Sequence, residues 1–304
     1  MPRKSSAQLL AELAATNDGL VSKPVGIWSL EKLATLLLYF QAFTSACKSV
    51  GGGYYIDGLA GPGICKVRNA RPLPYFAWGS PLLALRTFPE FQRCMFIELG
   101  GGNSASLRQR IGGFGNRAEV IPGDVNLELP RLLREVVPPH APCFCLLDQQ
   151  GTEVLWTTLE AVAATARRKR KPELLILFPL RMSLLRLLTT TGRVSESNRD
   201  QISASFGTLD FMEIYEGRVS GRLTAAEAQQ QYLALYEERI RGLGYRWVRS
   251  KPISAPKAYG MRPQEMYHLI FATDHQTGDK IMQDVFERPY VLHYPVSAQP
   301  SLFE

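Results

Sequence analysis

Residues 54–63 read YYIDGLAGPG, an apolar run of strand-forming residues that ends at Asp57 and continues into three closely spaced glycines. These glycines are Gly58, Gly61 and Gly63. Backbone without side chains, placed directly after a strand, lets main-chain N–H groups approach a small molecule closely at the carboxyl edge of an α/β sheet. We therefore predict that residues 54–57 form a strand that delivers a ligand-binding loop.

The loop chemistry narrows the class of ligand. Phosphate-binding loops carry GxGxxG or GxxxxGKS/T directly before a helix. Neither pattern occurs here, Pro62 stiffens the turn, and we expect residues 64–78 to be irregular and to delay the next helix. A sulfonium cofactor with an amino-acid tail, such as S-adenosylmethionine, needs no phosphate cradle and suits this loop. The alternative, glycines that serve only the backbone angles of a tight turn, stays open.

The composition is that of a globular protein. The chain has 304 residues, of which 45% are hydrophobic and 21% are charged, which excludes fibrous and disordered classes. No uninterrupted apolar run reaches the roughly 20 residues of a membrane span, and the start, MPRKSS, lacks a secretory core. We expect a cytoplasmic protein that does not associate with a membrane. The net charge of +7 favours acidic partners, nucleic acid among them.

The cysteines and the basic run have simple structural explanations. Five dispersed cysteines predict no disulfide framework, and Cys143 and Cys145 share one face of a predicted strand without a second ligand pair. We expect them to be buried and expect no metal site. The run Arg167 to Lys171 follows a predicted helix, whose carboxyl end cations stabilise. A contact with phosphate remains the alternative.

Strand-like and helical patterns alternate along the chain. Apolar strand runs occur at residues 53–57, 94–98, 118–121, 143–148 and 173–178. Amphipathic helical patterns occur at residues 30–47, 81–86, 104–111, 127–136 and 153–168. Such alternation with near-continuously apolar strands predicts a parallel sheet covered on both faces.

The alternation changes after the fifth strand. Residues 180–221 are polar and partly helical, which indicates an insertion, and a helix at 224–241 precedes two β runs at 244–248 and 266–272 that are too close for a crossover helix. We therefore predict a doubly wound, mostly parallel seven-stranded sheet with an antiparallel last strand, the class I methyltransferase-like Rossmann fold. Residues 1–28 would form an N-terminal extension and residues 29–304 this domain.

Acidic residues at the predicted strand ends indicate a site. Glu98 closes the second strand, where doubly wound folds place a carboxylate that accepts hydrogen bonds from ribose hydroxyls. Asp124 and Val125 follow the third strand, beside the expected adenine. The alternative, that these acids only cap helices or turns, stays open. We predict that the following residues bind the cofactor: Asp57, Gly58, Leu59, Ala60, Gly61, Gly63, Glu98, Asp124 and Val125.

The fourth strand ends at the expected position of the methyl group. There Asp148, Gln149 and Gln150 are the candidate catalytic residues, which would orient the methyl acceptor. Methyl transfer needs alignment of the acceptor more than strong acid–base help.

The chain also resembles a known family, the three-Cys-motif partner proteins (TcmP). The similar stretches are residues 55–63, 79–82, 96–98 and 267–273, and their order agrees from about residue 30 to residue 286. The resemblance implies a methyltransferase-like Rossmann protein that works with a partner carrying a three-cysteine, iron–sulfur type motif, and it adds Ser80 to the cofactor site. The chain departs from the family at residues 99–102 and at 148–151, where relatives carry Asp-Pro-Phe-Gly.

Two functions of different classes follow. The first is an S-adenosylmethionine-dependent methyltransferase that acts on nucleic acid. The second is a catalytically inactive or cofactor-sensing partner subunit, which the loss of Pro-Phe after Asp148 favours. The sequence does not specify the oligomeric state.

Overall fold

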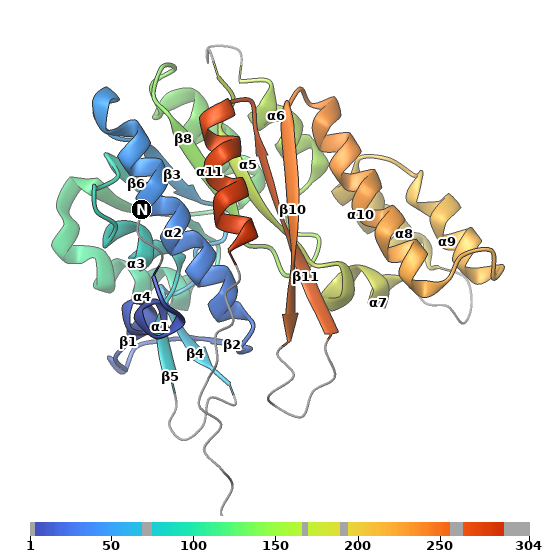
Figure 1. The fold of residues 1–304 in the computed structure, drawn as a ribbon, viewed down its shortest axis with the longest axis horizontal. Coiled ribbons are helices and arrows are strands. Elements are labelled where there is room, and N and C mark those ends of the chain that lie inside the picture. Colours follow the sequence, from blue (N-terminus) through green and yellow to red (C-terminus); the bar gives the residue numbers. More distant parts are fainter. Residues whose placement is uncertain (1–3, 69–74, 166–169, 189–193, 256–263, 289–304) are drawn as a thin grey trace, which may run out of the picture.

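The main sheet confirms the predicted fold class. The computed structural model describes residues 4–68, 75–165, 170–188, 194–255 and 264–288 (Figure 1). Its larger sheet has seven strands in the order β10-β11-β9-β8-β3-β6-β7. All pairs among β9, β8, β3, β6 and β7 are parallel, whereas β11 is antiparallel to both of its neighbours. This is the class I methyltransferase-like Rossmann arrangement. The strands are β3 (Tyr54–Asp57), β6 (Arg93–Glu98), β7 (Ala118–Pro122), β8 (Cys143–Leu147), β9 (Glu173–Phe178), β10 (Trp247–Ala255) and β11 (Gln264–Thr273).

Helices cover both faces of this sheet because successive strand side chains point to opposite faces. Tyr55 and Phe144 belong to one core cluster, while Ile56 and Cys145 belong to the other. The first face is covered by α2 (Ser29–Cys47), α3 (Ser80–Leu85), α4 (Gly101–Ile111) and α11 (Gln276–Glu287). The second face is covered by α5 (Val125–Glu135), α6 (Trp156–Ala163) and α10 (Ala225–Gly242). Short 3₁₀ turns, η1 (Lys48–Val50) and η2 (Gly112–Arg117), follow α2 and α4.

A second sheet involves the residues that precede α2. It has four strands in the order β1-β5-β4-β2, and helix α1 (Ser6–Leu13) packs on α2 beside it. The expectation that residues 64–78 are irregular is wrong, because β4 and β5 pair antiparallel there. Strand β2 pairs in parallel with β4, so that Lys23 lies opposite Cys65. The strands are β1 (Ala14–Ala15), β2 (Lys23–Val25), β4 (Ile64–Val67) and β5 (Tyr75–Trp78).

The segment after β9 is helical over its described residues. A π-helical turn, η3 (Leu180–Leu184), continues into α7 (Leu185–Leu187). The later described residues of the segment form α8 (Glu196–Phe206) and α9 (Phe211–Val219). Phe206 is fully buried, and its ring contacts those of Phe178, Phe211 and Tyr236. The segment therefore packs against α10 and the second face of the sheet (Figure 1).

A buried acid at the amino end of β9 predicts a pH-dependent stability. The Glu173 carboxylate accepts hydrogen bonds from Tyr39 Oη at 2.5 Å and from Thr273 Oγ1 at 3.0 Å. Burial raises the pKa of Glu173 to about 7, even though both hydroxyls lower it. Because the folded pKa lies above the unfolded value, the ionised form destabilises the fold. Stability contributed by this group is present at acidic pH and falls as the pH rises from about 4.5 through 7, by roughly 3 kcal/mol.

We expect Glu173→Gln to remove this part of the pH dependence. The measurement is urea unfolding at pH values on both sides of 6, in parallel with Glu119→Gln, which alters a half-exposed acid on β7. The unaltered protein and the Glu119 variant should lose stability with rising pH more steeply than the Glu173 variant. Parallel profiles for all three proteins would contradict the prediction.

Candidate functional site

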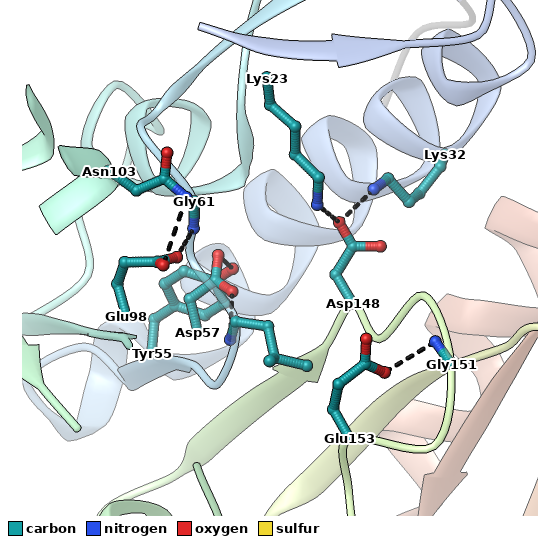
Figure 2. Close-up of polar contacts among 11 residues, drawn as sticks. Lys23, Lys32, Tyr55, Asp57, Gly61, Glu98, Asn103, Asp148, Gly151 and Glu153 are labelled. Atoms are coloured by element: carbon teal, nitrogen blue, oxygen red, sulfur yellow. Dashed lines mark hydrogen bonds and ion pairs between the residues drawn. The ribbon is translucent and has the colours of Figure 1, made fainter. Parts of the chain in front are cut away.

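Four acidic residues meet at the carboxyl edge of the main sheet. Asp57 ends β3, Glu98 ends β6, Asp148 directly follows β8, and Asp124 precedes α5 after β7. These strands are parallel neighbours, so their carboxyl ends lie at the same edge. Figure 2 shows three of these carboxylates around the glycine loop. The sheet topology thus brings together acids whose successive separations in the chain are 24 to 41 residues.

The glycine loop is held by the backbone of both neighbouring strands. The Gly58 N–H donates to Leu146 O at 2.8 Å, and the Ala60 N–H donates to Ile97 O at 3.0 Å. A Cβ atom at Gly58 would lie only 2.8 Å from side-chain carbons of Leu147 and Val125. Gly58 is therefore required by close packing, and the loop passes over the ends of β8 and β6.

Glu98 links two glycine-rich segments through its side chain. Its Oε2 accepts from the Gly61 N–H at 2.7 Å, and its Oε1 accepts from Asn103 Nδ2 at 3.3 Å (Figure 2). The same Oε1 accepts from the Gly100 N–H at 2.7 Å. Gly61 has φ of 64°, in the left-handed region that favours glycine. A carboxylate has about four acceptor positions. Three are used by described residues, which leaves Oε2 able to accept one hydroxyl group.

Asp57 supports the loop from below. It is fully buried, and it accepts hydrogen bonds from Tyr55 Oη at 2.9 Å and from the Leu59 N–H at 3.4 Å. Burial raises the pKa of Asp57 to about 6, while the Ser80 and Tyr55 hydroxyls lower it. Ser80 is itself buried at the start of α3. Asp57 and Ser80 therefore connect β3 to α3 beneath the glycine loop.

Asp148 is paired with two lysines. Its Oδ2 lies 2.5 Å from Lys32 Nζ and 3.7 Å from Lys23 Nζ (Figure 2). Asp148 and Lys32 are buried, with residue exposures of 8% and 7%. Burial alone would lower the pKa of Lys23, but the carboxylates of Asp148, Asp57 and Glu98 raise it above its usual value.

Sequence reasoning missed both lysines. Lys32 had a detectable signal, because it stands alone as a cation in the strongly apolar helical stretch of residues 30–40. A lone buried cation indicates a buried partner. Lys23 had no such signal, since only the pairing of β2 with β4 brings it to the site.

The remaining residues after β8 point in different directions. Gln149 is 2% exposed, and its side-chain oxygen accepts from the Val154 N–H at 3.2 Å. Gln150 is exposed. The Gly151 N–H donates to Glu153 Oε2 at 2.7 Å (Figure 2). Of the three candidate catalytic residues, only Asp148 contacts other side chains of the site.

Asp124 and the residues near it form the outer end of the site. Asp124 is exposed and caps α5, since its Oδ1 accepts from the N–H and from Nδ2 of Asn126, both at 2.9 Å. Val125 is buried beneath Gly58. Two large apolar side chains stay exposed here, Leu99 directly after β6 at 76% and Leu127 in the first turn of α5 at 71%.

The cysteines and the basic run lie apart from this edge. Cys143 and Cys145 are buried, as predicted, with their Sγ atoms 3.9 Å apart. Among the described residues, no cluster of three His, Cys, Asp or Glu side chains has the arrangement of a metal site. In the basic run, residues 167–169 lie outside the described residues, and the Lys171 N–H donates to Asp274 Oδ2. None of the described helices has both the length and the apolar character needed to cross a membrane.

Comparison with known proteins concerns the fold. No protein-family model and no curated protein sequence matches the chain. Among solved structures, it is similar to LPL1258 from Legionella pneumophila, with a TM-score of 0.49, 11% identity and coverage of 83% of this chain and 90% of that one. It is similar to Trm1 from Pyrococcus horikoshii, solved with S-adenosyl-L-methionine, with a TM-score of 0.41, 10% identity and coverage of 81% and 57%. It is also similar to an O-methyltransferase from Bacillus cereus, solved with SAH, with a TM-score of 0.41, 13% identity and coverage of 90% and 92%.

Proposed function

We propose that this chain is an S-adenosylmethionine-dependent methyltransferase of the three-Cys-motif partner type, which acts on nucleic acid. The observation that carries the proposal is the position of Glu98. Its carboxylate holds Gly61 and Gly100 at the carboxyl edge of the sheet and retains one acceptor position beside the loop. A ribose hydroxyl fits that position, as in other doubly wound folds.

The donor set fits the cofactor. The backbone of residues 58–63 forms the loop against which the cofactor lies, and Glu98 accepts a ribose hydroxyl. Asp124 and Val125 would stand beside the adenine, and the exposed Leu99 and Leu127 would offer it apolar surface. The remaining members of the set support the loop from within: Asp57 and Ser80. When bound, the cofactor supplies an electrophilic methyl group, and the chain contributes orientation and exclusion of water.

The acceptor is proposed to be nucleic acid because of the charge of the chain. A net charge of +7 attracts polyanions over long distances. The partner, a protein with a three-cysteine, iron–sulfur type motif, follows from the family resemblance alone.

A second candidate, a cofactor-sensing partner subunit without catalysis, is favoured by one observation. The two buried polar side chains after β8 have internal partners, since Asp148 Oδ2 pairs with lysines and the Gln149 side-chain oxygen accepts from the Val154 N–H. In this case the cofactor site reports the availability of cofactor to the partner.

Binding and transfer measurements separate these functions. Calorimetric titration with S-adenosylmethionine and S-adenosylhomocysteine should give dissociation constants in the micromolar range, about −8 kcal/mol. Transfer of labelled methyl groups to total RNA or DNA is then measured, with and without the cysteine-motif partner. Binding with transfer supports the enzyme, and binding without transfer supports the partner subunit. No binding at cofactor concentrations of about 1 mM would contradict both.

A further inference from the structure

The Lys23 and Asp148 side chains present opposite charges next to each other at the site. The distance from Lys23 Nζ to Asp148 Oδ2 is 3.7 Å, which is an ion pair but longer than a direct hydrogen bond. Within the described part of the chain, no residue forms a hydrogen bond with the Lys23 ammonium or with Asp148 Oδ1. Both groups therefore retain hydrogen-bonding capacity toward a ligand.

Lys32 explains why Asp148 holds its position. At 2.5 Å from Asp148 Oδ2, its ammonium group occupies one oxygen of the carboxylate and leaves the other. Lys32 is buried in α2, so the pair is rigid compared with a pair on the surface. Lys32 is thus a positioning residue for Asp148.

Lys23 lies between Asp148 and the glycine loop. Its Cδ would be 3.7 Å from a Cβ atom at Gly61, so its aliphatic part runs beside the loop (Figure 2). The Lys23 side chain is 26% exposed and is therefore accessible to a ligand. A ligand that lies along the glycine loop would meet the Lys23 ammonium and the Asp148 carboxylate together.

An adjacent ammonium and carboxylate are complementary to an α-amino acid, which carries the same two charges on one carbon. A zwitterion adds no net charge to a cluster where the carboxylates of Asp148, Asp57 and Glu98 already oppose two lysines. A simple amine would approach two ammonium groups without offering them an anion. The geometry therefore favours a zwitterionic ligand over an amine acceptor at this position.

We infer that Lys23 and Asp148 form the receptor for the α-amino-acid tail of the cofactor, with the tail carboxylate bound by Lys23 and the tail ammonium bound by Asp148 Oδ1. The inference rests on the proposed function, because the amino-acid tail is that of S-adenosylmethionine. It moves Asp148 from orientation of the acceptor to binding of the cofactor. It also gives the residues before α2 a role in the site.

The test compares two ligands that differ only in the tail. S-adenosylhomocysteine carries the amino-acid tail, whereas 5′-methylthioadenosine has the same nucleoside and sulfur without it. We expect Lys23→Met to weaken binding of S-adenosylhomocysteine about tenfold or more and to leave 5′-methylthioadenosine within about twofold, because only the first ligand has the carboxylate. Lys66→Met is the matched control, since Lys66 is an exposed lysine of the neighbouring strand β4.

A second pair of measurements keeps the two charges separate. Asp148→Asn is made together with Lys32→Met, so that no buried ammonium loses its partner. This double variant should bind S-adenosylhomocysteine more weakly and bind 5′-methylthioadenosine with unchanged affinity. Decarboxylated S-adenosylmethionine keeps the tail ammonium but lacks the carboxylate. Its binding affinity should be unchanged by Lys23→Met and lowered by the Asp148 change.

The outcomes are distinct. Equal losses for both ligands in Lys23→Met, or unchanged binding of S-adenosylhomocysteine, would overturn the tail receptor while the proposed cofactor site stands. If the unaltered chain binds 5′-methylthioadenosine as tightly as S-adenosylhomocysteine, the tail has no receptor and the inference also fails. Absence of binding for both ligands would overturn the proposed function and the inference together.

Discussion

Replacing Glu98 by alanine is expected to weaken binding of S-adenosylhomocysteine about a hundredfold or more. The carboxylate accepts from the Gly61 and Gly100 N–H groups. In the proposed site, its remaining acceptor position takes a ribose hydroxyl. Hydrogen bonds to a charged group contribute about 1.5–3 kcal/mol each, so the loss of the ribose contact together with the loss of loop order accounts for this factor. Calorimetric titration of the variant measures it directly.

The control for Glu98→Ala is Glu119→Ala. Glu119 lies on the adjacent strand β7, with a half-exposed side chain paired to Arg93. The control should bind as the unaltered protein does, and both variants should keep the circular dichroism of the fold. If the Glu98 variant binds S-adenosylhomocysteine with unaltered affinity, Glu98 does not contact the cofactor. The observation on which the proposed function rests would then be lost.

Phe144→Ala is expected to lower the free energy of unfolding by about 4 kcal/mol. Phe144 is fully buried on β8, and its ring packs against those of Tyr39 and Tyr55 at centroid distances of 5.0 and 6.0 Å. It also contacts Phe40 and Phe43 of α2. Removing the ring leaves a cavity among side chains that are anchored in different elements, and such a site collapses poorly.

Urea denaturation measures this loss, and Phe88→Ala is its control because Phe88 is 83% exposed. The control should change stability by less than about 0.5 kcal/mol. A loss below about 1 kcal/mol in Phe144→Ala would mean that the core repacks, and that the aromatic cluster does not hold α2 against the sheet.

The aromatic core and the site share one residue. The Tyr55 ring stacks on Phe144 with an interplanar angle of 15°, and its hydroxyl donates to Asp57 beneath the glycine loop. The Tyr55 side chain therefore connects Phe144 in the core to Asp57 beneath the loop.

The fold class and the acidic strand ends follow from local sequence. Near-continuous apolar runs of strand length, such as residues 173–178, favour strands buried on both faces, and their alternation with helices implies a parallel sheet. Because parallel strands share a carboxyl edge, Glu98 and Asp148 could be placed together without coordinates. These conclusions depend on periodicity and strand direction, which short segments contain.

Tertiary structure alone decided how the site is charged and which side chains face it. Lys23 reaches Asp148 because β2 pairs with β4 across about 40 residues of chain, and no local pattern encodes that pairing. Gln149 turns inward to the Val154 N–H because a buried backbone donor needs an acceptor, which only the folded loop reveals. The sequence by itself determined the sheet and the edge at which we propose that the cofactor binds. The long-range contacts determined that the strand β8 carboxylate is paired with two lysines, because charge pairing depends on distances between segments that are remote in the chain.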